Sequence, residues 1–247
     1  MTSARVLVIE TQGLVPLGNL EYPLRAAGVE LEYWRPAEER PPTTLSGFSG
    51  LVALGGAANP DEDEIHQWLG SERKLLVEVL DRGIPTVGIC LGAELLAQVL
   101  QATVTPLPRP EIGWVDLEPD QASQIDPLCG GLPRRFSAFQ WHSYGFDQPP
   151  GTTLIAGTRD AAQIFGWQRF AWGFQFHLEV DKTIISRWIH RYGDSLRANG
   201  LDSRYLRAET ALRDQSYGAQ ARRIGFAFAE LVVAFKPRRA RVIHAIS

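Results

Sequence analysis

The chain has 247 residues and a formal net charge of −3, with 45% hydrophobic and 21% charged residues. This length suits one sizeable α/β domain, alone or with a small appendage, and the composition is typical of a soluble globular protein. A net charge of −3 does not indicate the basic surface that binding to DNA or RNA requires, so no nucleic-acid partner is expected. Two cysteines, Cys90 and Cys129, are too few for a disulfide framework, and we expect both as thiols in the cytoplasm.

Apolar β-branched runs alternate with helical patterns in the first half of the chain, as in a parallel sheet covered by helices. Strands are expected at residues 5–9, 31–34, 50–54 and 86–89. The first run is too short for a signal-peptide core or a membrane span, so no membrane partner is expected. Helices are expected at residues 17–27, closed by Gly28, and at residues 64–82, closed by Gly83. The sequence therefore predicts an α/β fold with a central, mostly parallel sheet flanked by helices.

From residue 104 to residue 171 the pattern changes to short strands and turns rich in glycine and proline. We expect this part to add antiparallel strands at the sheet edge and to supply loops around a site. Further on, one apolar stripe has helical spacing: Ile224, Phe228, Leu231, Val232 and Phe235. A basic segment follows it: Lys236, Arg238, Arg239 and Arg241. We therefore expect a main domain at residues 1–198 and a helical extension at residues 199–247 packed on it. The alternative is a helix that docks a partner or a second copy in a homodimer.

A strand-to-helix turn carries the first candidate catalytic residue. The segment Gly88-Ile89-Cys90-Leu91-Gly92 is a thiol version of the G-x-S-x-G nucleophile elbow. Such a sharp turn needs glycine on both sides, because larger side chains would collide with the neighbouring strand and helix. At a helix N-terminus the thiol pKa should be lowered, which favours the reactive thiolate. A buried structural cysteine is the alternative, and it is our interpretation of Cys129.

A thiol nucleophile needs a base that takes and returns a proton, and His177 is the best candidate among five histidines. It lies in the alternating segment 172–180, where side chains two residues apart share one face. His177 and Glu179 can then point together toward Cys90, with Glu179 accepting the Nδ1 proton. On its own, a His-x-Glu sequence more often marks a surface histidine beside a carboxylate. Together with the cysteine elbow upstream, it favours a catalytic histidine instead.

These segments together resemble the class I glutamine amidotransferases, and most closely the stand-alone members similar to the glutaminase domain of GMP synthase. The resemblance covers about residues 5–195 and depends mainly on residues 88–92 and 173–179. Three further segments match the family: Leu54-Gly55-Gly56 at its glycine loop, residues 108–114 at the strand after the nucleophile helix, and residues 139–144 at its substrate loop.

The resemblance implies a flavodoxin-like fold and hydrolysis of the γ-carboxamide of glutamine, with Cys90, His177 and Glu179 as the catalytic residues. A γ-glutamyl thioester would form on Cys90 as ammonia leaves, and water would hydrolyse it to glutamate. The backbone N–H groups of Gly56 and Leu91 would form the oxyanion hole. The implied substrate-binding residues are Gly55, Glu94, Ser143 and Tyr144. No cofactor and no metal ion are implied.

Two positions depart from the pattern of the family. Glu94 stands where glutamine is common, and its carboxylate would attract an α-ammonium group. This suits a γ-glutamyl ligand without implying a strict preference for free glutamine. Alternatively, Glu94 turns away and pairs with an arginine. The substrate loop reads Ser143-Tyr144 where close relatives more often have Gly-Asp.

Neither a P-loop nor a Ser-Gly-Gly pyrophosphatase loop occurs in the sequence, so we expect ammonia to pass to a separate synthetase or ligase subunit. Three functions remain open: a glutamine amidotransferase or glutaminase, a γ-glutamyl hydrolase acting on γ-glutamyl amides or peptides, and an idle binding or regulatory module. The two enzymes share one acyl-enzyme and differ in the leaving group. The third has no use for Cys90, His177 and Glu179 together.

Overall fold

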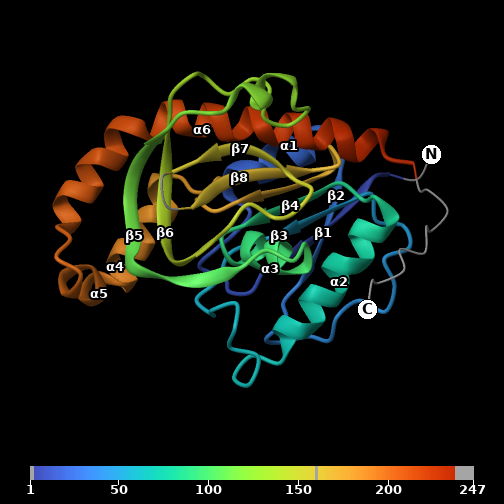
Figure 1. Cartoon of the computed structure of the whole chain (residues 1–247), viewed down its shortest axis with the longest axis horizontal. Coiled ribbons are helices and arrows are strands. Elements are labelled where there is room, and N and C mark those ends of the chain that lie inside the picture. The colour runs from blue at the N-terminus through green and yellow to red at the C-terminus, as the bar shows by residue number, and fades with distance from the viewer. Residues whose placement is uncertain (1–2, 159–160, 237–247) are drawn as a thin grey trace.

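The centre of the protein is a seven-stranded sheet of order β2-β1-β3-β4-β9-β8-β7 in a computed structural model that describes residues 3–158 and 161–236 (Figure 1). Its strands are β1 (Arg5–Ile9), β2 (Glu30–Trp34), β3 (Gly50–Ala53), β4 (Thr86–Ile89), β7 (Thr153–Gly157), β8 (Ala162–Trp167) and β9 (Ala171–Phe174). Strands β2, β1, β3, β4 and β9 pair in parallel, whereas β8 and β7 are antiparallel at one edge. The predicted α/β fold with antiparallel edge strands is confirmed.

Helices cover both faces of this sheet. They are α1 (Glu21–Ala26), α2 (Trp68–Arg82), α3 (Leu91–Val99), α4 (Lys182–Arg191), α5 (Gly193–Ala198) and α6 (Ser203–Ala234), with short 3-10 turns η1 (Gly18–Leu20) and η2 (Gln121–Ile125). Side chains alternate along β1: Val6 and Val8 share a core with α1, α4 and α6, whereas Leu7 and Ile9 share one with α2 and α3. The chain therefore has a three-layer α/β/α arrangement.

Two long strands stand apart from the main sheet. β5 (Val104–Leu117) and β6 (Phe136–Phe146) pair only with each other, as an antiparallel ribbon. The sequence predicts edge strands in this region, and only β7 and β8 meet that prediction. β5 contains three prolines, at positions 106, 108 and 110, and its pairing is interrupted between Pro106 and Glu111. Proline cannot donate a ladder hydrogen bond, which suits a strand with a single partner.

Two helix boundaries differ from the prediction. The helix expected at residues 64–82 begins at Trp68, because the preceding residues form turns. The backbone N–H of Asn59 donates to Oε2 of Glu62 at 2.8 Å, and Ile65 donates to the Glu62 carbonyl at 3.0 Å. Such local bonds compete with the helix. The helix expected at residues 17–27 is shortened to α1 because η1 precedes it.

The long helix α6 crosses one face of the sheet (Figure 1). Ile224, Phe228 and Val232 of the apolar stripe are buried there, and a Cβ atom on Gly225 would lie only 2.9 Å from Cγ of Pro23 in α1. The division into residues 1–198 and 199–247 stays a prediction. Of the basic segment, Arg238, Arg239 and Arg241 lie outside the described residues.

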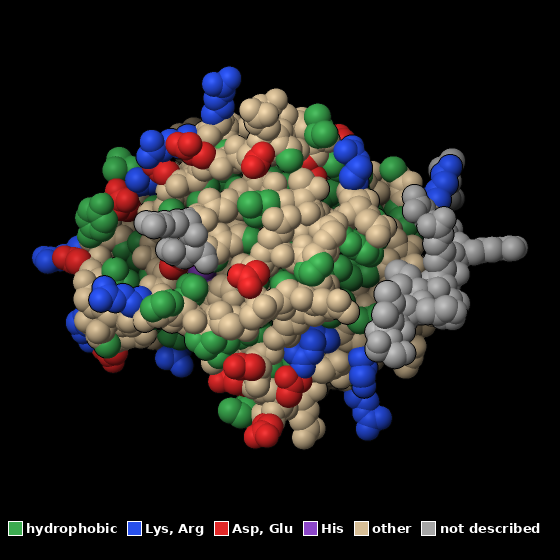
Figure 2. All heavy atoms as spheres, in the orientation of Figure 1, with side chains coloured by type: hydrophobic (Ala, Val, Ile, Leu, Met, Phe, Trp, Pro, Cys, Tyr) green, Lys and Arg blue, Asp and Glu red, His purple; other side chains and the backbone are tan. Residues whose placement is uncertain are grey.

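The outer surface mixes charges of both signs. Figure 2 shows basic and acidic side chains interspersed around the rim of one face, over the residues that the structure describes. Among the helices in the described ranges, none has both the length and the hydrophobicity needed to cross a bilayer.

Candidate active site

Cys90 lies at the sharp turn between β4 and α3, at the carboxyl end of the parallel strands. Its backbone angles, φ 50° and ψ −113°, are rare for a residue with a side chain, and such strain is typical of functional positions. A Cβ atom on Gly88 would lie 2.6 Å from the Gly92 carbonyl oxygen, and one on Gly92 would overlap the Ala53 carbonyl oxygen. The collision expected from the sequence is therefore confirmed.

The ionisation of the thiol differs from the prediction. Cys90 is 5% exposed, and burial raises the pKa of its thiol although the nearby His177 imidazole lowers it. The expectation of a lowered pKa is wrong for the cavity without substrate, because loss of water around the thiolate outweighs the favourable charges. The thiol therefore needs a base to take its proton during attack.

His177 lies between a bend at residues 175–176 and a turn that contains Glu179, rather than in the extended strand that the alternating sequence predicts. The two residues nevertheless meet, because Nδ1 of His177 lies 2.7 Å from Oε1 of Glu179, and both residues are buried. Burial lowers the pKa of His177, but Glu179 and the Cys90 sulfur together raise it well above its ordinary value. The carboxylate thus makes the imidazole a stronger base.

Three contacts hold His177 in place. Trp188 of α4 packs edge-on against its ring, with centroids 4.7 Å apart. The backbone N–H of His177 donates to the Phe139 carbonyl at 2.9 Å, and the Tyr217 hydroxyl of α6 donates to the His177 carbonyl at 2.6 Å. Sequence reasoning missed Trp188 and Tyr217, because each lies on a helix without any catalytic motif.

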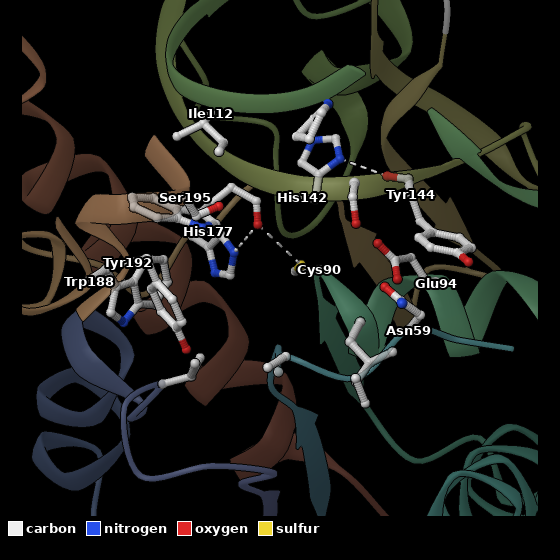
Figure 3. A pocket seen from close by; sticks show the side chains of 18 of the residues that line it. Asn59, Cys90, Glu94, Ile112, His142, Tyr144, His177, Trp188, Tyr192 and Ser195 are labelled. Atoms are coloured by element: carbon white, nitrogen blue, oxygen red, sulfur yellow. Dashed lines mark hydrogen bonds between the residues drawn. The ribbon is translucent and has the colours of Figure 1, made fainter. Parts of the chain in front are cut away.

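Cys90 and His177 lie near each other in the cavity (Figure 3), and Gly55 lies against both of them. A Cβ atom on Gly55 would lie 3.1 Å from Cε1 of His177 and 3.2 Å from Cβ of Cys90. The Trp141 carbonyl oxygen lies 4.0 Å from Sγ of Cys90 and 3.4 Å from Nε2 of His177. Glycine at position 55 therefore leaves the space in which thiol and imidazole face each other.

The two residues predicted for the oxyanion hole flank the thiol. Gly56 and Leu91 line the same cavity as Cys90, and Leu91 is the first residue of α3. The Thr11 hydroxyl donates to the Gly55 carbonyl at 2.6 Å, and a Cβ atom on Gly56 would overlap that hydroxyl oxygen. Thr11, which sequence reasoning missed, thus holds the glycine loop after β3.

A cavity of about 230 Å³ opens over Cys90. Its lining includes His177 and three of the predicted substrate-binding residues, Glu94, Ser143 and Tyr144. Gly55 does not line the cavity. Its lack of a side chain leaves the space between Cys90 and His177 free. Across residues 3–158 and 161–236, no group of three or more His, Cys, Asp or Glu side chains is arranged to hold a metal ion.

Glu94 lies in the first turn of α3, is 3% exposed, and faces the cavity (Figure 3). Nε2 of Gln175 donates to its Oε1 at 2.9 Å. Burial raises the pKa of Glu94, while the Gln175 amide and the imidazoles of His142 and His177 oppose that rise. The alternative in which Glu94 turns away to pair with an arginine is wrong, since the side chain lines the cavity and bonds to an amide.

A buried polar network supports residues 139–144, the predicted substrate loop. Nδ1 of His142 donates to the Tyr144 carbonyl at 2.7 Å, and its Nε2 lies 2.9 Å from Oε1 of Gln140 and 3.1 Å from Oε2 of Glu111. The hydrogen bond with His142 lowers the pKa of Glu111. His142 therefore links β6 to β5 and holds the Tyr144 backbone. The Gln-x-His alternation on β6 is the sequence signal for this cluster.

Comparison with known proteins gives consistent results. The model of the family described as glutamine amidotransferase class-I matches residues 17–189. The chain is 32% identical over 146 residues to a glutamine-hydrolyzing GMP synthase of Thermomicrobium roseum, a match that covers 58% of this chain and 25% of that protein. It is 33% identical over 150 residues to one subunit of the glutamine-hydrolyzing GMP synthase from Thermoplasma acidophilum, covering 60% and 71% of the two chains.

Among solved structures, a glutamine amidotransferase from Thermotoga maritima has a TM-score of 0.84 and 31% identity. The superposition covers 93% of this chain and 100% of that one. The match thus extends over the full length of the Thermotoga protein, whereas it covers only a quarter of the Thermomicrobium enzyme.

Proposed function

The chain belongs to the class-I glutamine amidotransferase family, and from that membership we propose that it hydrolyses the γ-carboxamide of glutamine through a thioester on Cys90. The family predicted from the sequence is confirmed. The observation that most directly supports the proposed chemistry is the 2.7 Å contact between His177 and the buried Glu179, in a site where the imidazole faces a strained cysteine.

In the first half-reaction, Sγ of Cys90 attacks the γ-carbonyl carbon while His177 takes the thiol proton. Negative charge develops on the carbonyl oxygen, and the backbone N–H groups of Gly56 and Leu91 stabilise it, each by about 3 kcal/mol when well placed. His177 then protonates the amide nitrogen, the C–N bond breaks, and ammonia leaves.

In the second half-reaction, water gives a proton to His177 and its oxygen attacks the thioester carbon. The C–S bond breaks, the proton returns to sulfur, and glutamate leaves. Glu179 acts through His177 by fixing the ring and raising its basicity. The amino-acid end of the substrate is held by Glu94 and by the backbone of Ser143 and Tyr144, beside the space left by Gly55.

The proposal is tested by incubating the purified chain with glutamine and measuring both products. Glutamate and ammonia should appear in equal amounts, and the Cys90→Ala variant should release neither above background. A well-folded wild-type chain that releases no glutamate would overturn the proposal.

We further propose that the ammonia reaches a separate synthetase or ligase subunit in the cytoplasm. The Thermoplasma acidophilum relative is named as one subunit of its enzyme, which supports a two-chain arrangement, and two buried free thiols suit a reducing compartment. A candidate synthetase should aminate its substrate from glutamine only with this chain present, and should still use ammonium ions when Cys90→Ala replaces it. Amination from glutamine without this chain would contradict the partnership.

A further inference from the structure

The cavity has two sides of different chemistry on either side of Cys90 (Figure 3). On one side lie Glu94, Asn59 and Tyr144, with a carboxylate and several hydrogen-bonding groups. The other, which we name the aromatic side, is made of Ile112, Trp141, Trp188, Tyr192 and Ser195. None of these five residues is charged. Ammonia, a leaving group with one non-hydrogen atom, has no need of such a surface.

The aromatic side is a preformed wall. Trp188 is 3% exposed, its indole N–H donates to the Leu14 carbonyl at 2.7 Å, and its ring packs against His177 and Trp141, so it is the rigid support behind this side of the cavity. The Trp141 ring packs against Trp188 at 5.7 Å and against Tyr192 at 6.0 Å between centroids. Rings packed in this way lose little freedom when a further ring joins them.

The position of His177 decides which part of a substrate reaches this wall. The imidazole protonates the leaving nitrogen, so that nitrogen must lie next to Nε2 of His177. The same imidazole ring packs against Trp188 at 4.7 Å. Since the amino-acid end lies on the opposite side, with Glu94, a substituent on the nitrogen is directed past His177 onto the partly exposed rings of Trp141 and Tyr192.

We propose that the aromatic side is a leaving-group subsite, and that the chain also hydrolyses γ-glutamyl amides whose nitrogen carries an apolar, aromatic group. This inference rests on the proposed function. The reaction uses one water: the C–N bond breaks, His177 supplies the proton to the departing amine, and the thioester is hydrolysed to glutamate as for glutamine. The products are glutamate and the amine that carries the aromatic group.

The test compares three substrates that share the γ-glutamyl group: γ-glutamylbenzylamide, γ-glutamylmethylamide and γ-glutamylglycine. We expect kcat/KM for the benzylamide to exceed that for the methylamide by about tenfold, from burial of the ring. We expect γ-glutamylglycine to be the poorest, because its carboxylate would meet only uncharged groups on the aromatic side. A benzylamide no better than the methylamide would overturn the inference.

Two variants locate the effect. Tyr192→Ala should reduce the benzylamide-to-methylamide ratio several-fold, and Ser195→Trp, at an exposed position on α5, should reduce it by filling the subsite. Tyr205→Ala is the matched control, since Tyr205 is 67% exposed on α6 and lies outside the cavity lining. An unchanged ratio in both subsite variants would also overturn the inference.

The outcomes separate this inference from the proposed function. If the chain hydrolyses glutamine but does not prefer the benzylamide over the methylamide, only the leaving-group subsite is refuted. If the wild-type chain hydrolyses neither glutamine nor any of the three amides, both the proposed function and the subsite are refuted.

Discussion

Cys90 combines a reactive side chain with a backbone conformation that favours glycine. Cys90→Ala and Cys90→Gly both remove the thiol, so both should lack activity, but only glycine relieves the strain. Because such conformations cost about 1–3 kcal/mol, Cys90→Gly should be about 1 kcal/mol more stable than Cys90→Ala after its greater unfolded-state entropy is counted. Urea unfolding measures the difference, and equal stabilities would mean that the turn is not strained.

The two thiols should differ sharply in reactivity. Cys90 lines the cavity and faces His177, whereas Cys129 is completely buried and its pKa is raised well above the ordinary value by burial and by Asp126. A glutamine analogue with an electrophile at its γ position should therefore label Cys90 and spare Cys129. Peptide mass spectrometry of the native protein gives the ratio, and preferential labelling of Cys129 would refute the assignment of the nucleophile.

Glu94→Gln should weaken capture of the amino-acid end. An ionised carboxylate bonded to an α-ammonium group contributes roughly 1.5–3 kcal/mol, so KM should rise about tenfold with little change in kcat. Burial raises the pKa of Glu94, so the wild-type carboxylate takes up a proton, and KM rises, at a higher pH than for an ordinary glutamate. Glu94→Gln should lose that acid-side rise in KM.

Glu78→Gln, a change on the surface of α2, serves as the control and should leave the KM profile unaltered. Identical KM values for wild type and Glu94→Gln, for both glutamine and a γ-glutamyl peptide, would remove Glu94 from substrate binding.

How far the site could be predicted depended on how local its signals are. The elbow around Cys90 and the pair His177 and Glu179 are short motifs, and the structure brings these residues together. The direction of the Cys90 pKa was not predictable, because burial is a property of the folded chain. Trp188 and Tyr217 reach the site only through the packing of α4 and α6.

At the scale of elements, α2 carries a carboxyl group where its apolar face meets the core. Glu72 has no exposed surface, both of its oxygens lack a hydrogen-bond partner, and burial raises its pKa to about 8. Its unfolded pKa is about 4.3, so the folded state holds a proton between these values that the unfolded state has lost. This proton makes its full contribution to the free energy of unfolding below about pH 4. It is lost as pH rises through about 8.

Glu72→Leu should therefore stabilise the protein at pH 8.5 by several kcal/mol and far less at pH 5. Urea unfolding at the two pH values tests this, with Glu78→Gln, at a half-exposed position of α2, as a control. A Glu72→Leu effect that does not depend on pH would show that the carboxyl group ionises freely in the folded protein.

Elements with a strong local pattern were predictable almost to the residue. β1 and β4 match the expected bounds, because their runs are short, apolar and β-branched. β5 was not predictable as one long strand, because its prolines indicate turns and only its pairing with β6 makes it extended. The late start of α2 reflects bonds between Asn59 and Glu62, which periodicity does not report.

For the whole molecule, α6 connects the last described part of the chain to the candidate active site. The Tyr217 hydroxyl donates to the His177 carbonyl, and its ring packs against Trp114 at 5.0 Å. Tyr217→Phe keeps the ring and removes one buried hydrogen bond, worth about 1 kcal/mol. We expect kcat to fall several-fold at nearly constant KM, because the backbone that carries the base is less firmly held.

Steady-state kinetics and thermal unfolding measure the two effects of this substitution. Tyr205→Phe, on the exposed face of the same helix, is the control and should change neither. A Tyr217→Phe variant with wild-type kcat and lower stability would restrict α6 to a structural role.

The bond from Tyr217 to His177 also has a consequence for the order of synthesis. Ribosomes make a chain from its N-terminal side onward, so Cys90, His177 and Glu179 all exist before residue 217 has been added. A nascent chain can therefore contain the nucleophile, the base and the carboxylate while the base lacks its aromatic tether. His177 therefore gains this hydrogen bond only after α6 has emerged and docked on the rest of the fold.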